Sequence, residues 1–215
     1  QGIAAPSQKA QMACVQAAYT AAGLSPASAQ YVEAHGTGTR QGDPIELRAL
    51  GAVLGAGRSA AKPCLVGSVK SNLGHGETAA GITGLIKTVL CLKHRQIPAS
   101  LHYSRPNPSV DLHGLGLKVS DALMPFPAED QELVASASSF GFGGTNAHAV
   151  LSASPVVDRD GATSSASAAP GLQLLWLSAR SPEALAHLRR DYAEWLEANP
   201  EVEIADLCAS THLRR

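Results

Sequence analysis

The chain has 215 residues, of which 45% are hydrophobic, and its 17 basic and 18 acidic residues leave a formal net charge of −1. This is the composition of a globular protein, and the length allows one good core and a small second unit. Aromatic residues make up only 4% and there is no basic excess, so nucleic-acid binding has little support. No apolar run reaches membrane-spanning length and no signal peptide is visible, so we expect a cytoplasmic protein without membrane partners.

The first elements follow from capping residues and hydrophobic patterning. We expect a helix over 7–22, because Ser7 can cap its start and Gly23 stops it. A short, partly apolar run at 30–34 predicts a strand, which leads into a glycine-rich bend at 35–39.

A second helix is predicted to begin at Asp43–Pro44, with Asp43 as N-cap and Pro44 at the first helical position. The apolar run 64–69 predicts a buried strand, and a long helix is expected over 77–93. The apolar residues of that long helix are expected to pack inward; they are Ile82, Leu85, Ile86, Val89 and Leu90.

Three more strands are predicted, at 115–119, 133–138 and 147–151. The order of elements is therefore α-β-α-β-α-β-β-β, which is typical of an α/β protein with helices layered on a sheet.

The composition changes after Ser152, and we interpret 153–171, rich in Ser, Ala, Asp and Gly, as a flexible linker. After it, 172–178 is predicted to be a strand, Ser181 to cap a helix, and 204–211 to form a shorter helix. One strand and two helices cannot build a robust core alone, so we expect 172–215 to be an incomplete domain. The first residues lack an initiator Met, which also suggests a piece of something larger.

His35 lies at the end of a predicted strand, where α/β proteins commonly place their sites. The hydroxyls of Thr37 and Thr39 are expected to face the same bend. The alternative for His35 is a histidine that caps a strand end without any chemical role.

A second candidate group surrounds His75, which precedes the long helix and follows Lys70. A nearby lysine disfavours protonation of an imidazole, and a neutral histidine can donate an N–H to a developing oxyanion. Glu77, at the start of the helix, could pair with Lys70. The alternative is a helix-capping cluster with a solvated Lys–Glu pair, which contributes little.

A glycine-rich loop at 139–145 lies between two predicted strands, and its N–H groups could hold an anion or an oxyanion. Phe140 and Phe142 could line a hydrophobic channel there; the alternative is a β-turn with two core aromatic residues. His148, within the last strand, is interpreted as a structural histidine whose hydrogen bonds are satisfied.

Metal binding is the rival explanation for His35 and His75, but the usual zinc spacings such as HExxH or paired CxxC are absent. The sequence therefore predicts no metal site. The cysteines have no CxxC spacing either, and we expect free thiols at Cys14, Cys64, Cys91 and Cys208.

Four segments together resemble the C-terminal half of a beta-ketoacyl synthase (ketosynthase) domain of modular type I polyketide synthases. They are His-Gly-Thr-Gly-Thr at 35–39, Gly-Asp-Pro-Ile-Glu at 42–46, Lys-Ser-Asn-Leu-Gly-His at 70–75 and Gly-Phe-Gly-Gly-Thr-Asn-Ala-His at 141–148. The resemblance covers 1–152 and includes the order and spacing of the motifs. From Leu172 onward the chain resembles the start of the linker domain that joins ketosynthase to acyltransferase.

The resemblance implies a thiolase-like α/β fold, of which this chain supplies the second, layered αβα half, followed by a small α/β linker unit. It also implies decarboxylative Claisen condensation of an acyl thioester with a malonyl-type extender. The extender is carried on the phosphopantetheine arm of an acyl carrier protein, and no cofactor is bound directly. The implied partners are the N-terminal half of the ketosynthase, the carrier protein, the neighbouring acyltransferase domain and, in the complete protein, a second copy.

The resemblance also assigns roles to residues. His35 and His75 would hold the enolate oxygen, and Lys70 with Glu77 would support His75. The backbone N–H of Phe142 would help form an oxyanion hole, and its ring would gate the pocket. Thr37 and Thr39 would contact the pantetheine arm, and the remaining substrate-binding residues would be Phe140, Gly143 and Asn146.

One departure matters for activity. The nucleophilic cysteine of the family lies in the N-terminal half, in a Cys-Ser-Ser context that none of the four cysteines here has. Covalent catalysis needs an activated nucleophile, so the chain alone is expected to be inactive. The alternative is a non-catalytic docking or assembly module derived from a ketosynthase half. A polar face where the first half would pack would favour that module, and an apolar face would favour the enzyme.

Overall fold

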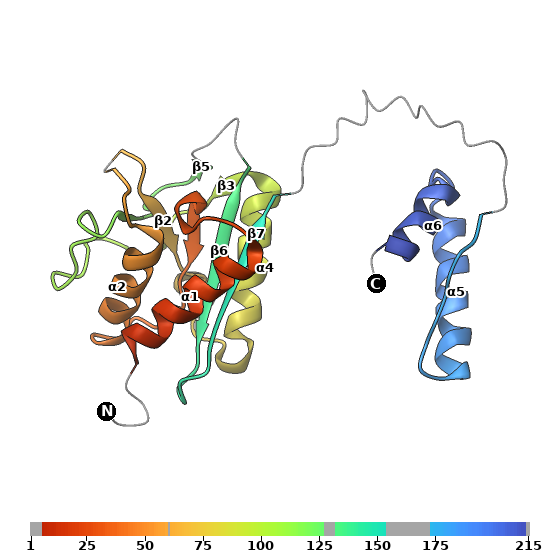
Figure 1. Cartoon of the computed structure of the whole chain (residues 1–215), viewed down its shortest axis with the longest axis horizontal. Helices are drawn as coiled ribbons and strands as arrows, with labels where there is room; N and C mark the ends of the chain where they lie inside the picture. Colours follow the sequence, from red (N-terminus) through yellow and green to blue (C-terminus); the bar gives the residue numbers. More distant parts are fainter. Residues whose placement is uncertain (1–5, 60, 127–131, 154–172, 214–215) are drawn as a thin grey trace. The chain divides into compact units, whose positions relative to one another are not determined.

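The computed structural model describes residues 6–59, 61–126, 132–153 and 173–213 of the chain. The chain separates into two compact units, Gln1–Val156 and Val157–Arg215. Figure 1 shows the helices and strands of both units.

The first unit is a mixed α/β structure. In chain order its elements are α1 (Gln8–Ala22), the 3-10 turn η1 (Pro26–Ser28), β1 (Tyr31–Glu33), α2 (Gly42–Leu54), β2 (Cys64–Gly67), α3 (Lys70–Leu73), the 3-10 turn η2 (Glu77–Ala79), α4 (Ala80–His94), β3 (Gln96–Ile97), β4 (Leu117–Val119), β5 (Met124–Pro125), β6 (Val134–Phe140) and β7 (Asn146–Ser152).

Five strands form one sheet in the order β4-β2-β1-β6-β7. The first four strands of that order run parallel, and β7 pairs antiparallel with β6. The two short strands β3 and β5, which the sequence pattern did not predict, pair with each other. The central strands β1 and β2 are buried along their whole length, as expected for parallel strands covered on both faces.

Helices cover both faces of the sheet, with α1 and α2 on one side and α4 on the other (Figure 1). Alternate residues of β1 divide between the two cores: Val32 packs with Val15 of α1 and Leu50 of α2, whereas Tyr31 packs with Cys91 of α4. The predicted layered αβα architecture is confirmed.

Capping residues account for several helix boundaries. Ser7 accepts a hydrogen bond from the N–H of Ala10, and Gly23 ends α1 in the left-handed conformation at φ 67°, both as predicted. The predicted N-cap at Asp43 is wrong. Helix α2 begins at Gly42, and the Asp43 carboxylate instead accepts a hydrogen bond from the N–H of Gly38 at 3.0 Å. The carboxylate stabilises the preceding bend rather than the helix end.

The predicted inward face of α4 is also wrong. Ile82, Ile86, Val89 and Leu90 are between 46% and 55% exposed within this chain, and only Leu85 of the predicted set is half-buried. The buried face carries Leu92 and four smaller residues, namely Ala80, Gly84, Thr88 and Cys91. The helix is apolar on two sides, and the small side chains allow its closest approach to the strands.

The second unit contains α5 (Pro182–Ala198) and α6 (Ile204–Leu213). Ser181 caps α5 by accepting a hydrogen bond from the N–H of Ala184, as predicted. The described part of the predicted strand 172–178 is irregular, and no strand lies in the described residues of this unit. An extended segment needs a neighbouring strand to form a ladder. The predicted linker, apart from Ala153, lies outside the described residues.

Candidate active site

Two histidine rings lie close together beyond the C-terminal ends of the parallel strands β1 and β2. His35 follows β1, and His75 follows the short helix α3 after β2, the parallel neighbour of β1. Their ring centroids lie 5.5 Å apart with an angle of 85° between the ring planes, and the Phe140 ring lies 6.0 Å from that of His35. The C-terminal ends of two adjacent parallel strands thus bring together residues 40 positions apart in the sequence.

Helix α2 holds the backbone of the bend at His35. The buried carboxylate of Glu46 accepts hydrogen bonds from the N–H of His35 at 2.7 Å and of Gly36 at 2.9 Å. Burial raises the pKa of Glu46 to about 7, although these two hydrogen bonds act in the opposite direction. Glu46 belongs to the quoted motif at 42–46, but its contact with the bend could not be read from the sequence.

The glycine at position 36 is required by the tight bend. Its φ is +52°, and a Cβ atom there would lie 2.8 Å from the hydroxyl oxygen of Ser68. Glycine therefore lets the backbone of His35 lie against the loop after β2.

His35 is half-buried, and its surroundings favour the neutral ring. Burial, followed by the charges of Lys70 and His75, lowers the pKa of His35 to about 4. Its Nδ1 atom is buried and has no hydrogen-bond partner in the described part of the chain, which leaves Nε2 as the nitrogen available to a ligand.

His75 is exposed, and a backbone hydrogen bond fixes its ring. Its Nδ1 accepts a hydrogen bond from the N–H of Glu77 at 2.9 Å. The neutral ring therefore carries its hydrogen on Nε2, which makes that atom a donor.

Lys70 supports His35, not His75. Its Nζ donates a hydrogen bond to the backbone carbonyl of His35. Burial lowers the pKa of Lys70, while the charges of Glu46, Glu33 and Asp43 act to raise it. The predicted ion pair of Lys70 with Glu77 is absent from the described residues, because the ammonium group turns toward the bend. Glu77 instead contributes its backbone N–H to His75.

The loop after β6 closes a hairpin. The N–H of Gly141 donates to the carbonyl of Thr145 at 2.7 Å, and the N–H groups of Phe142 and Gly143 take no part in this turn bonding. Phe140 is 9% exposed and contacts His35, whereas Phe142 is 86% exposed. Asn146 is half-buried and pairs with Phe140 at the start of β7.

The two threonines of the bend are exposed, and their hydroxyl oxygens lie 3.3 Å apart. Thr39 also accepts a hydrogen bond from the N–H of Gly42 at 3.0 Å, so it stabilises the entry to α2. Thr37 is the freer hydroxyl of the pair, although it too contacts Thr39.

His148 lies apart from this group. Its Nδ1 is 3.0 Å from the Ser138 hydroxyl, its ring packs 5.9 Å from that of Tyr19, and burial lowers its pKa to about 4. The prediction of a structural histidine is right about its setting, but the buried Nε2 has no partner in the residues that the structure describes.

The cysteines are free thiols, as predicted. Burial raises the pKa of Cys64 to about 12, of Cys91 to about 11, and of Cys14 above its ordinary value. A nucleophilic thiol needs a lowered pKa, so none of these three has the surroundings of a nucleophile. Within the described ranges, no group of three or more His, Cys, Asp or Glu side chains could hold a metal ion. No helix there is both long and apolar enough to cross a membrane.

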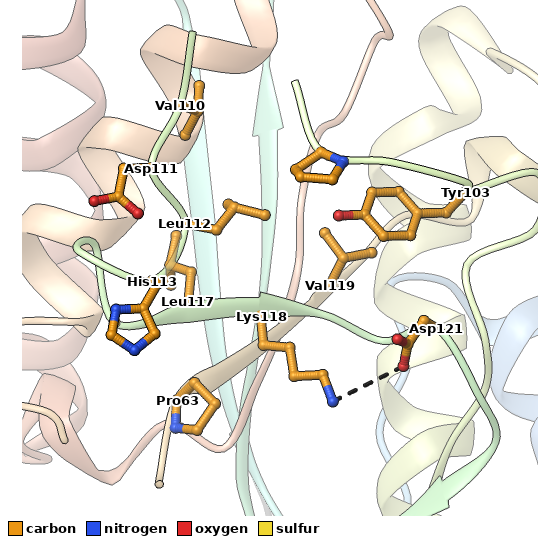
Figure 2. A pocket seen from close by; sticks show the side chains of 12 residues that line it. Pro63, Tyr103, Val110, Asp111, Leu112, His113, Leu117, Lys118, Val119 and Asp121 are labelled. Carbon is orange, nitrogen blue, oxygen red and sulfur yellow. Dashed lines mark ion pairs between the residues drawn. The ribbon is translucent and has the colours of Figure 1, made fainter. Parts of the chain in front are cut away.

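A pocket of about 390 Å³ lies along the edge strand β4 and contains none of the predicted site residues. Figure 2 shows its lining, with the Lys118–Asp121 ion pair at 3.9 Å and the Tyr103 ring beside Val119. His35 follows β1 and His75 follows α3, and neither lines this pocket.

Comparison with known proteins agrees with the fold. Residues 1–104 match the family "Beta-ketoacyl synthase, C-terminal domain", and residues 106–215 match "Ketoacyl-synthetase C-terminal extension". The chain belongs to the beta-ketoacyl synthase family, as the C-terminal half of a ketosynthase of the modular polyketide synthase kind.

Named relatives point the same way. Over all 215 residues the chain is 44% identical to a component of the phenolphthiocerol/phthiocerol polyketide synthase of Mycobacterium tuberculosis, of which it spans 11%. It is 46% identical over 205 residues to polyketide synthase GfsA of Streptomyces halstedii, of which it spans 3%. The chain therefore spans a small fraction of these relatives.

A solved structure is similar as well. The ketosynthase from module 6 of the bacillaene synthase of Bacillus subtilis superposes with a TM-score of 0.67 at 35% identity, and the match covers 97% of this chain and 35% of that one.

Proposed function

We propose that this chain supplies the enolate-stabilising part of a ketosynthase active site, which performs decarboxylative Claisen condensation in a complete polyketide synthase. The observation that carries the proposal is the pairing of two histidine rings 5.5 Å apart beyond the C-terminal ends of β1 and β2. One ring is kept neutral by its surroundings, and the other, when neutral, has its Nε2 hydrogen fixed by a backbone hydrogen bond.

The chemistry follows from where charge develops. When the malonyl-type thioester loses CO2, the electron pair of the broken carbon–carbon bond passes into the enolate and places negative charge on the thioester oxygen. The Nε2–H groups of His35 and His75 donate hydrogen bonds to that oxygen. One such donor is worth about 10²–10³ in rate in well-studied enzymes. Burial, and after it the charge of Lys70, favours the neutral His35 ring. Lys70 also fixes the backbone there by its hydrogen bond to the His35 carbonyl.

The enolate carbon then attacks the acyl carbon held on a cysteine, and the carbon–sulfur bond breaks to release the thiolate. That cysteine belongs to the N-terminal half, in keeping with the raised thiol pKa values here. The backbone N–H of Phe142 contributes to the oxyanion hole for the acyl-cysteine, and its exposed ring closes over the substrate. Gly143 and Asn146 complete the wall beside Phe140.

The extender arrives on the phosphopantetheine arm of an acyl carrier protein. The Thr37 and Thr39 side chains are exposed, and their hydroxyls contact this arm in the proposed complex. The proposed reaction uses no cofactor bound to the chain itself. An adjoining acyltransferase domain supplies the extender unit, and the complete ketosynthase pairs with a second copy.

A non-catalytic assembly module is the second candidate, and one observation weighs against it. The outer face of α4 presents Ile82, Ile86, Val89 and Leu90, each about half exposed. An independent module would carry polar residues on such a face. The apolar stripe favours packing against an N-terminal half that completes the site.

The test is the His35→Ala variant of the complete protein. We expect it to abolish CO2 release from malonyl-carrier protein, because the variant loses a donor to the enolate oxygen. Acylation of the cysteine should persist, since the histidine pair acts on the extender. Unchanged CO2 release would contradict the proposal.

A further inference from the structure

The carboxylate of Glu33 is buried on the face of the sheet that α4 covers, opposite to the face covered by α2. The Glu33 side chain is 1% exposed, and that of its ion-pair partner Lys87 is 12% exposed. Oε2 of Glu33 accepts a hydrogen bond from the Tyr31 hydroxyl at 2.5 Å and lies 2.9 Å from Nζ of Lys87. Its other oxygen, Oε1, accepts a hydrogen bond from the N–H of Val69. Both oxygens of this carboxylate are therefore engaged.

These contacts join three elements. Glu33 ends β1, two residues before His35, and Val69 is the N-cap of α3, one residue before Lys70. Lys87 lies on α4. One carboxylate thus ties the segment that carries His35 to the segment that carries Lys70 and His75, and anchors both to α4.

Two glycines pack closely against Glu33 and Tyr31, with little space for a larger side chain. A Cβ atom on Gly84 of α4 would lie 3.2 Å from Cγ of Glu33, and a Cβ atom on Gly67 would lie 2.6 Å from the Tyr31 hydroxyl. Glycine at both positions brings the helix and the β2 end close enough for the carboxylate to bridge them. Nζ of Lys87 also lies 5.8 Å from the centre of the Tyr31 ring.

Resting on the proposed function, we propose that Glu33 and Lys87 are positioning residues that set the geometry of the His35–His75 pair for decarboxylation. A buried ion pair is often no more stabilising than apolar residues of the same volume. The Glu33–Lys87 pair instead fixes the end of β1 relative to the segment that follows β2. A displacement of about 1 Å at a reacting centre can cost about 10² in rate, so loosening the junction acts on the chemical step.

The test uses the complete synthase with Lys87→Met, Lys87→Arg and, as the matched control, Lys93→Met. Lys93 is an exposed residue on the same helix. Two steps are measured separately: CO2 release from malonyl-carrier protein, and acylation of the cysteine by an acyl thioester. We expect Lys87→Met to lower CO2 release by about 10–100-fold with acylation unchanged. Lys87→Arg should recover part of the rate, and Lys93→Met should behave as wild type.

Equal losses in both steps, or no loss in either, would overturn the positioning role. If Lys87→Met fails to fold, the double variant Glu33→Gln/Lys87→Met leaves no buried charge unpaired. Its CO2 release should still be reduced, because a glutamine has only one acceptor oxygen for the contacts of Glu33, and a wild-type rate would again overturn the idea. The His35→Ala variant separates the two proposals. If CO2 release is lost there but not in Lys87→Met, only the positioning role fails.

Discussion

The donor role that we propose for the two histidines rests on different surroundings for each ring. His35 is half-buried against Lys70 and Phe140, so its charged form is disfavoured by desolvation and by a neighbouring cation. His75 is exposed, and the N–H of Glu77 occupies its Nδ1. In the proposed mechanism, both rings donate from Nε2 to an enolate between them. Of the two rings, only that of His75 has a hydrogen bond at Nδ1 within the described residues, and this bond places the hydrogen of the neutral ring on Nε2.

The lowered pKa of His35 gives a prediction on pH. The imidazole should titrate with a midpoint near 4, because burial and Lys70 oppose its protonation. The unfolded chain binds this proton more readily, so the contribution to stability is complete above about pH 6.5 and is lost as the pH falls toward 4. NMR titration of the ring hydrogens in the 215-residue chain, assigned with His35→Gln, measures the midpoint. A value between about 6 and 7 would contradict the account.

Some of the site could be predicted at this scale and some could not. Histidines beside glycines at strand ends were visible in the sequence, and the structure brings His35 and His75 together. The supporting carboxylates were missed. Glu33 and Glu46 lie in segments whose pattern predicts a strand and a helix, and their bonds to Val69 and His35 depend on how those elements pack. The expected Lys70–Glu77 pair failed for the same reason.

At the scale of elements, the sequence pattern did not predict which face of α4 packs against the sheet. Its sequence is apolar on two faces, so periodicity alone could not distinguish the face that meets the sheet. The larger residues suggested an inward face, but the small residues Gly84 and Thr88 pack against the strands. Residues 173–178 show the converse limit, because an apolar run forms a strand only when another strand pairs with it, and the described residues of this unit contain none.

The exposed stripe of α4 gives a second prediction. In the complete protein, Ile86→Ala should lower the free energy of unfolding by about 2–5 kcal/mol, because the side chain would be buried against the N-terminal half. Ile86 is 53% exposed in this chain. Urea denaturation of both variants measures the effect, with Lys93→Ala as the control on the same helix. A loss for Ile86→Ala within about 0.5 kcal/mol would mean that the stripe stays in water.

At the scale of the first unit, the alternation of helices and strands was sufficient to predict an α/β layered unit, and its αβα form was implied by the resemblance to ketosynthases. Parallel strands buried on both faces need helices on both sides, and the order of elements satisfied this. The pairing of β3 with β5 was not predictable, because two-residue strands carry no periodic signal. The candidate site lies past the C-terminal ends of the inner strands β1 and β2, and its residues do not line the pocket along the edge strand β4.

The most direct test of the account is CO2 release from malonyl-carrier protein by the complete synthase carrying His75→Ala, with His113→Ala as control. His113 is an exposed histidine beside the β4 pocket. The account predicts a loss of about 10²–10³ in rate for His75→Ala, with the cysteine still acylated and the control unchanged. Wild-type CO2 release from His75→Ala would contradict the claim that the paired histidines stabilise the enolate.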